Sequence, residues 1–215
     1  MANAVETMAE AVLAQPAQGR RRLVAVVGAP GSGKSTLAGQ LRYALRERGE
    51  TARVVPMDGF HLDNATLQER GHLDRKGAPW TFDVAGFVDL CKRLKTDDQV
   101  TFPEFDRDTD NVIADAGEIG PGDSTVIVEG NYLLYDEDGW RDLAPLWDMS
   151  IRLIVPMEDL ERRLTERWTG LGLDAQTTRQ KVLGNDLPNA KLVYTHALPA
   201  THGLRPPETQ AAQNS

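Results

Sequence analysis

The chain has 215 residues, of which 40% are hydrophobic and 26% are charged, and its formal net charge is −8. This length predicts a single domain with a substantial core. The acidic balance argues against a protein that coats nucleic acid or an anionic membrane, although a local basic pocket can still hold a small anion. The single cysteine, Cys91, excludes an internal disulfide and a multi-cysteine metal site.

The chain shows no sign of membrane insertion or export. No apolar run approaches the ~20 residues of a membrane span, and the N-terminus lacks the basic and apolar regions of a secretory signal. We therefore expect a cytoplasmic protein whose partners include neither nucleic acid nor a membrane. The sequence leaves open whether it forms a homo-oligomer.

Helical and strand-like patterns alternate along the chain. Helical spacing of apolar residues predicts helices over 5–13, 34–48, 83–95, 158–168, 174–183 and 189–194. Short apolar runs predict strands over 23–27, 53–57, 125–128 and 151–155, and irregular strand pieces over 99–105 and 111–116. This alternation predicts an α/β fold with a mainly parallel sheet and helices on both faces. The last strand is poorly signalled, and the composition predicts one domain over 1–204 and a flexible tail over 205–215.

One segment between a predicted strand and a predicted helix carries a strong signal for phosphate binding. It reads Gly28-Ala29-Pro30-Gly31-Ser32-Gly33-Lys34-Ser35 and fits the pattern G-x-x-x-x-G-K-[ST] at every defined position. The glycines let backbone N–H groups approach phosphate oxygens, and the helix points its positive end at the same anion. Lys34 is placed to neutralise the transferring phosphates, and the Ser35 hydroxyl to bind Mg²⁺. We expect residues 28–36, including Thr36, to bind ATP with Mg²⁺ in a P-loop NTPase fold.

Two carboxylates follow other predicted strands. Asp58 comes after the second strand, where a carboxylate can take the proton of an attacking hydroxyl; alternatively, it is an ordinary turn residue before Gly59. Glu129 ends the run Val126–Val128, where it can hold Mg²⁺ directly or through water; alternatively, it is a solvated acid at a strand end.

Five segments occur in an order that resembles a known family. They are the loop at 28–36, Met57-Asp58-Gly59-Phe60-His61, Arg75-Lys76-Gly77 with Thr81-Phe82-Asp83, Pro103-Glu104-Phe105-Asp106, and Val128-Glu129-Gly130-Asn131-Tyr132-Leu133-Leu134. Together they resemble the P-loop kinase superfamily of uridine kinase, phosphoribulokinase and type I pantothenate kinase. The likeness is strongest to bacterial fructose transport system kinases and nucleoside/nucleotide kinase-like proteins.

The resemblance implies roles for several residues. It makes Asp58 the general base and Glu129 a support for Mg²⁺, and it places Asp83 at the sugar hydroxyls of the acceptor, although Asp83 is equally suited to cap a helix. His61 is a further candidate for substrate contact. Phe105 stands where uridine kinases carry a tyrosine, and the following turn lacks their histidine, which counts against uridine or cytidine.

The polar turn after this segment has two interpretations. Asp106 and Arg107 are candidates for binding a polyol, and a solvated turn is the alternative.

The resemblance also implies a lid over about residues 162–175. Arg163 and Arg167 are four residues apart and share a helix face, so they can stabilise the phosphates when the lid closes. The alternative is a solvent-exposed helix face with Glu–Arg pairs. The resemblance places Asn185 and Asn189 near the adenine, although both residue types are also common in loops.

These observations predict an ATP-dependent phosphotransferase whose acceptor is a small-molecule alcohol, such as the sugar fructose. A nucleoside or pantothenate kinase is the alternative within the same class. A nucleotide-dependent regulatory or accessory protein of a transport system is the alternative from another class, and it would need no acceptor pocket.

Overall fold

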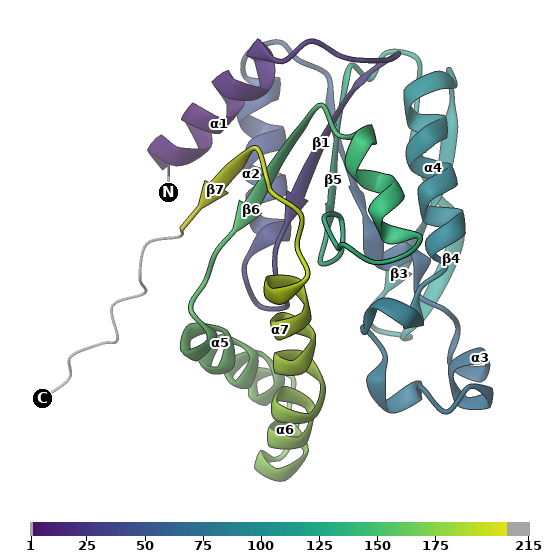
Figure 1. Ribbon diagram of the computed structural model, residues 1–215, viewed down its shortest axis with the longest axis vertical. Coiled ribbons are helices and arrows are strands. Elements are labelled where there is room, and N and C mark those ends of the chain that lie inside the picture. The colour runs from purple at the N-terminus through teal and green to yellow at the C-terminus, as the bar shows by residue number, and fades with distance from the viewer. Residues whose placement is uncertain (1, 206–215) are drawn as a thin grey trace, which may run out of the picture.

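The computed structural model describes residues 2–205 and has an α/β architecture (Figure 1). Its main sheet has five parallel strands in the order β2-β5-β1-β6-β7. These strands are Ala52–Pro56, Thr125–Gly130, Arg22–Val27, Met149–Leu153 and His202–Leu204. The predicted parallel sheet is confirmed, and the poorly signalled last strand is three residues long and begins at His202.

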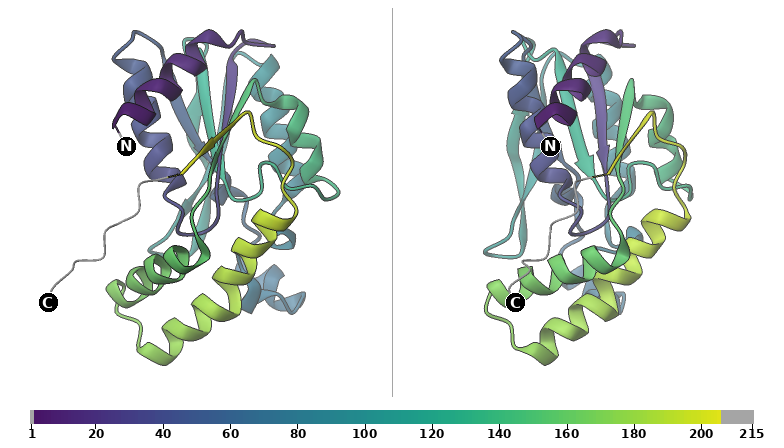
Figure 2. Two further views of the ribbon diagram at one scale, coloured as in Figure 1. Left: turned by 60° about the vertical axis from the view of Figure 1, so that its left-hand side comes forward. Right: turned by 90° about the vertical axis from the view of Figure 1, so that its left-hand side faces the viewer.

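Helices cover both faces of this sheet, as the three-layer prediction requires. On one face lie α1 (Ala2–Ala14) and α2 (Lys34–Arg46), and on the other lie α4 (Val84–Thr96) and the 3₁₀ segment η4 (Trp140–Leu146) (Figures 1 and 2). A hydrophobic core lies on each face of the sheet, and alternate residues of β1 point into the two cores. Val24 and Val26 pack with α1 and α2, whereas Leu23 and Ala25 pack with α4.

The predicted irregular strand pieces form one antiparallel hairpin. Strands β3 (Val100–Asp106) and β4 (Asn111–Ile119) pair with a register shift between Phe102 and Glu104. Before α4, the chain after β2 forms the 3₁₀ segment η1 (Met57–Phe60), the short helix α3 (Asn64–Glu69), η2 (Leu73–Arg75) and η3 (Pro79–Thr81).

The last helices form a pair that projects beyond the carboxyl ends of the strands (Figure 2). Helix α5 (Met157–Gly170) is followed by α6 (Ala175–Lys181), a π-helical turn (Val182–Asp186) and α7 (Leu187–Thr195). The two helices predicted over 174–183 and 189–194 are therefore joined without a loop. Such π-helical turns are frequent at functional sites.

Arg21 forms hydrogen bonds with several segments near the amino-terminal ends of the strands, opposite their carboxyl ends. Its side chain is only 1% exposed, and its guanidinium donates to the backbone carbonyls of Leu94, Asp97, Asp98, Gly120 and Asp123. Nothing in the apolar periodicity marks this arginine as a core residue.

Among residues 2–205, none of the helices has the length and apolar character needed to cross a lipid bilayer. Of the predicted tail over 205–215, residues 206–215 lie outside the described part of the chain.

Candidate functional site

The carboxyl ends of three neighbouring strands bring the phosphate loop, Asp58 and Glu129 together. The loop follows β1, Asp58 follows β2, and Glu129 lies in β5, which pairs with both of those strands. Glu129 is the register partner of Val26 in β1 and of Pro56 in β2. The order of the strands thus places three segments that are distant in sequence next to one another. They lie at the carboxyl ends of the strands, which is where parallel sheets bind ligands.

The backbone conformation of the phosphate loop is suited to surround an anion. Gly31 and Gly33 have φ angles of +76° and +90°, which residues with a side chain rarely adopt. Helix α2 begins at Lys34, and no side chain caps its first turn. In addition, the Ser32 hydroxyl is buried without a hydrogen-bond partner. The free N–H groups, this hydroxyl and the positive end of α2 fit the phosphates of a nucleotide.

Ser35 and Glu129 form the pair that was predicted to hold Mg²⁺. The Ser35 hydroxyl donates to Glu129 Oε1 over 2.9 Å, while Glu129 Oε2 is buried with no partner. Burial raises the pKa of Glu129, and the positive charge of Lys34 opposes that rise. A buried carboxylate with one unpaired oxygen, beside a hydroxyl and a phosphate loop, fits Mg²⁺, which is commonly held by one or two protein groups together with substrate phosphates.

Asp58 lies in η1 among three basic groups. Burial alone would raise the pKa of its carboxyl, but Lys34, His61 and Arg107 outweigh burial and hold that pKa below its usual value. Arg107 forms an ion pair with the Asp58 carboxylate from the turn of the β3–β4 hairpin. Asp58 is therefore ionised at neutral pH, as a proton acceptor must be.

His61 packs beside Asp58 and is neutral at pH 7. Its ring lies between Phe82 and Phe105, with centroid distances of 4.1 and 4.9 Å, and burial lowers its pKa despite the nearby Asp58 charge. The Asp58 backbone carbonyl accepts the Nδ1–H over 2.8 Å. This contact fixes the tautomer and leaves Nε2 as an acceptor.

One cavity of about 380 Å³ brings nine of the nineteen predicted site residues together. They include Pro30, Gly31, Lys34, Asp58, His61, Arg107, Arg167, Asn185 and Asn189. Two predicted substrate residues do not line it. Asp83 caps α4 by accepting from the Gly86 N–H over 3.0 Å, and Asp106 accepts from Asp108 N–H and the Thr109 hydroxyl within its own turn. For both, the structure supports the structural alternative that the sequence allowed.

Two arginines of α5 face the site, and a third belongs to the helix surface. Arg163 reaches the phosphate loop, where its Nη1 lies 3.5 Å from the Ser32 carbonyl, and Arg167 lines the cavity with its guanidinium over Trp168. Arg162 instead forms ion pairs with Asp159 and Glu166 on the helix surface. The alternative of a solvent-exposed helix face with ion pairs therefore applies to Arg162 but not to Arg163 and Arg167.

Asn185 and Asn189 lie on the Asp58 side of the phosphate loop. Arg75 donates to both side-chain oxygens over 3.2 Å, and Asn185 donates to the Lys76 carbonyl over 2.8 Å. These bonds join the π-helical turn and α7 to the segment around η2. The contact of the two asparagines with adenine stays a prediction.

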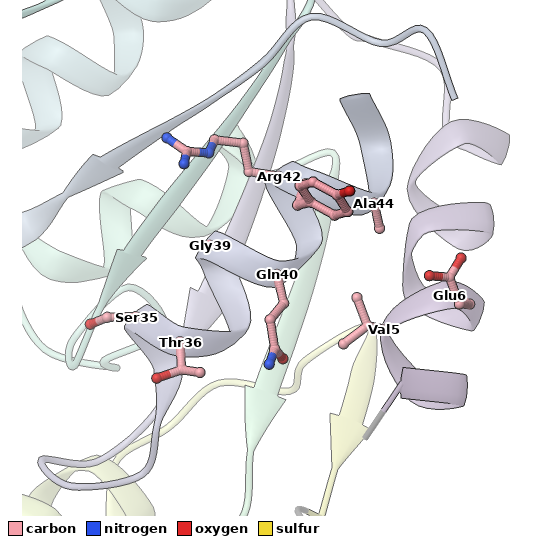
Figure 3. A pocket seen from close by; sticks show the side chains of 9 residues that line it. Val5, Glu6, Ser35, Thr36, Gly39, Gln40, Arg42 and Ala44 are labelled. Atoms are coloured by element: carbon pink, nitrogen blue, oxygen red, sulfur yellow. The ribbon is translucent and has the colours of Figure 1, made fainter. Parts of the chain in front are cut away.

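A second cavity, of about 610 Å³, lies along α2 and meets the phosphate loop at Ser35 and Thr36 (Figure 3). It extends over Gly39 and Gln40 towards Val5 of α1. The phosphate loop thus has open space on two sides, and only the smaller cavity contains Asp58.

Sequence reasoning assigned no role to several residues that line the Asp58 cavity. Lys76 donates to Asn64 Oδ1 over 2.7 Å and pairs with Asp110, and its ammonium lies over the Phe105 ring. The ordered Arg75-Lys76-Gly77 segment was the available signal for Lys76. Asn131 lies in the ordered segment 128–134, which was its available signal. Trp168 and Lys181 carry no such signal, because only the packing of α5 and α6 brings them into the site.

The chain is similar to proteins of one known family. The phosphoribulokinase/uridine kinase family profile matches residues 23–169. Among curated relatives, uncharacterized protein YggC of Escherichia coli is 35% identical over 180 residues, which cover 83% of this chain and 75% of YggC. The putative uridine kinase C227.14 of Schizosaccharomyces pombe is 34% identical over 187 residues, covering 81% of this chain and 78% of that protein.

Solved structures show the same fold. A putative fructose transport system kinase from Silicibacter sp. TM1040 is similar with a TM-score of 0.90 and 51% identity, over 93% of this chain and 98% of that one. YFH7 of Saccharomyces cerevisiae has a TM-score of 0.76 at 21% identity, over 95% of this chain and 98% of that chain, which supports the fold alone.

Proposed function

The chain belongs to the phosphoribulokinase/uridine kinase family of P-loop kinases, and from that premise we propose that it transfers the γ-phosphoryl group of ATP to the hydroxyl of a small molecule. The observation that carries this proposal is the shared cavity of Lys34 and Asp58. A phosphate-binding lysine and an ionised carboxylate face the same space, which is what in-line transfer to an alcohol requires.

In this proposal Asp58 accepts the proton of the attacking hydroxyl. Its low pKa keeps it ionised, and Arg107 leaves the carboxylate when the acceptor hydroxyl takes its place. His61 Nε2 accepts a hydrogen bond from an acceptor hydroxyl and so orients it. Lys34, Arg163 and Arg167 stabilise the negative charge that spreads over the transferring phosphoryl group.

Ser35 and Glu129 are the residues that would hold Mg²⁺, which supplies charge neutralisation at the phosphates. In the same proposal, α5 and α6 move over the phosphates as the lid predicted over about 162–175. The connection between α5 and α6 includes Gly172, whose φ angle is +84°.

The acceptor we favour is a sugar or sugar-like alcohol such as fructose. The name of the 51% identical Silicibacter protein refers to fructose transport, whereas that of the S. pombe relative refers to uridine. Phe105 packs on His61 here, so the wall of the cavity lacks the hydroxyl of a tyrosine at this position.

The test is ADP release from ATP and Mg²⁺ with fructose, other sugars, ribonucleosides, pantothenate or no acceptor. Strong acceleration by one compound would support the proposal. Asp58→Asn should then lower turnover by about two orders of magnitude or more while ATP binding is retained. Tight ATP binding with no acceleration by any compound would favour the regulatory alternative, and unchanged turnover in Asp58→Asn would remove Asp58 from the role of base.

A further inference from the structure

The Asp58 cavity adjoins a second depression, and basic side chains form their common wall. We call the Asp58 cavity the inner cavity and this depression the outer cavity. The outer cavity has a volume of about 390 Å³ and lies between η2 and helix α6. The two cavities share four lining residues, namely Leu73, Lys76, Lys181 and Asn185. A molecule whose hydroxyl faces Asp58 can therefore extend along Lys76 and Lys181 into the outer space.

Both cavities are more basic than the acidic chain that contains them. Five basic and three acidic side chains line the inner cavity, and three basic side chains and one acidic side chain line the outer one. The whole chain has a formal net charge of −8. The lining of both cavities thus carries a local excess of positive charge where the acceptor would lie, and a concave basic surface attracts anions.

Not all of these cations are required for ATP or for Asp58. In the proposed function, Lys34 and Arg167 serve the phosphates, and Arg107 pairs with Asp58. Lys181 forms no ion pair within the described chain; its ammonium lies 4.8 Å from the centre of the Trp168 ring. Lys76 pairs with Asp110, but its side chain is only 15% exposed whereas that of Asp110 is 56% exposed. An anionic acceptor can therefore replace the exposed Asp110 carboxylate at the Lys76 ammonium, which also donates to Asn64 Oδ1 and to the Asp110 carbonyl.

The surrounding groups are suited to hold a polar ligand. Arg75 is bound by the amide oxygens of Asn185 and Asn189 and lies over the Trp80 ring, so it adds positive charge that no carboxylate neutralises within the described residues. The Asn131 side-chain oxygen is buried at the inner cavity without a partner. An acceptor that donates a hydrogen bond to Asn131 and carries a negative charge would satisfy both features.

We propose that the acceptor alcohol carries an anionic group, a carboxylate or a phosphate, which Lys76 and Lys181 bind while the hydroxyl faces Asp58. This inference rests on the proposed kinase function and narrows its substrate class: within sugar-like acceptors it favours a sugar acid or a sugar phosphate over the neutral sugar. Two ammonium groups at one end and a proton acceptor at the other would give such a molecule a fixed orientation.

The first experiment separates candidate acceptors by charge before their identity is known. A small-molecule extract of the source organism is divided by anion exchange, and each fraction is incubated with the enzyme and γ-³²P-labelled ATP. We expect the wild-type enzyme, but not Asp58→Asn, to form a labelled product from the retained fraction. Phosphatase treatment of that fraction distinguishes the two sources of charge, because it removes a phosphate-bearing acceptor and spares a carboxylate.

Defined pairs of compounds test the same point: fructose 6-phosphate with fructose, glycerate with glycerol, and pantothenate with pantothenol. Product formed mainly from the unretained fraction, or a neutral member as the best acceptor, would overturn the anionic acceptor and leave the kinase proposal intact. A labelled product from neither fraction and no defined pair would overturn the kinase proposal itself.

Variants then test the two lysines. With the acceptor so found, Lys181→Gln and Lys76→Gln should each raise its KM by about 10-fold or more, with little change in kcat or in the KM for ATP. Lys191→Gln, an exposed lysine of α7 outside both cavities, is the matched control. A raised KM for ATP with an unchanged KM for the acceptor would assign the lysines to the nucleotide and overturn the inference.

Discussion

Arg107, in the turn of the β3–β4 hairpin, forms an ion pair with Asp58 at the end of β2. The hairpin is a separate two-stranded sheet, and this pair joins its turn to the edge of the main sheet that carries the phosphate loop. The contact has two consequences for the proposed chemistry: it lowers the pKa of the carboxyl, and it occupies Oδ2, one of the two oxygens that an acceptor hydroxyl could approach.

Removal of the Arg107 charge should move the acidic limb of the pH–rate profile. Lys34, His61 and Arg107 hold the pKa of Asp58 below its usual value against the opposing effect of burial. In Arg107→Gln one of these positive groups is lost, so the carboxylate is less stabilised and its pKa rises. We therefore expect the acidic limb of kcat/KM to move to higher pH, with solvent screening at the 59% exposed Arg107 side chain limiting the movement. Arg46→Gln, on the exposed surface of α2, is the control, and an unmoved limb in Arg107→Gln would show that this ion pair does not tune Asp58.

Gly59 should be intolerant of any side chain, because the backbone of β3 passes directly over it. A Cβ atom at this position would lie 2.0 Å from the Pro103 carbonyl oxygen, and backbone cannot rotate away as a side chain can. Gly59→Ala should destabilise the protein by on the order of 2 kcal/mol and lower turnover, since Asp58 is its neighbour. In Gly39→Ala, no atom outside the neighbouring backbone of α2 lies within 4 Å of the added carbon, and the variant should be more stable by about 0.5–1 kcal/mol. Thermal unfolding of both variants checks the contrast, and equal melting temperatures would contradict it.

Glu129→Gln should alter the requirement for magnesium more than the affinity for the acceptor. The substitution removes the charge of a buried carboxylate whose Oε2 has no protein partner. We expect the Mg²⁺ concentration for half-maximal rate to rise about 10-fold or more, with an unchanged acceptor KM. Glu47→Gln, at the exposed end of α2, should leave both values unchanged. If Glu129→Gln behaved like this control, Glu129 would not support the metal.

Arg21→Lys should separate stability from catalysis. Lysine keeps the positive charge, but its ammonium cannot reach the five carbonyls that the guanidinium joins, and buried carbonyls without donors are costly. We expect a loss of on the order of 3 kcal/mol in urea unfolding. Turnover at low temperature should be retained, because Arg21 precedes β1 and lies at the edge of the sheet opposite the site. Arg20→Lys, whose partner Asp98 is 75% exposed, should cost little.

The features of this protein that depend on local chemistry could be predicted from the order of residues along the chain. Residues 28–35 predict the phosphate loop because glycine backbone, a lysine and a helix start must be adjacent in the chain to surround a phosphate. The alternation of apolar runs with helical spacing predicts the parallel sheet, since strands buried on both faces must be apolar throughout. Asp58 and Glu129 could be selected because each directly follows or ends such a run.

Which of the polar residues meet depends on how the helices and strands pack in three dimensions. Asp83 and Asp106 are as polar as Asp58, but one caps α4 and the other closes its own turn, and sequence spacing does not distinguish these roles. Lys181 and Trp168 line the cavity because α5 and α6 pack beyond the carboxyl ends of the strands. The basic wall shared by the two cavities combines residues about 100 positions apart in the chain, Lys76 and Lys181. Such a wall depends on how helices pack, and packing is set by contacts between segments that no local pattern encodes.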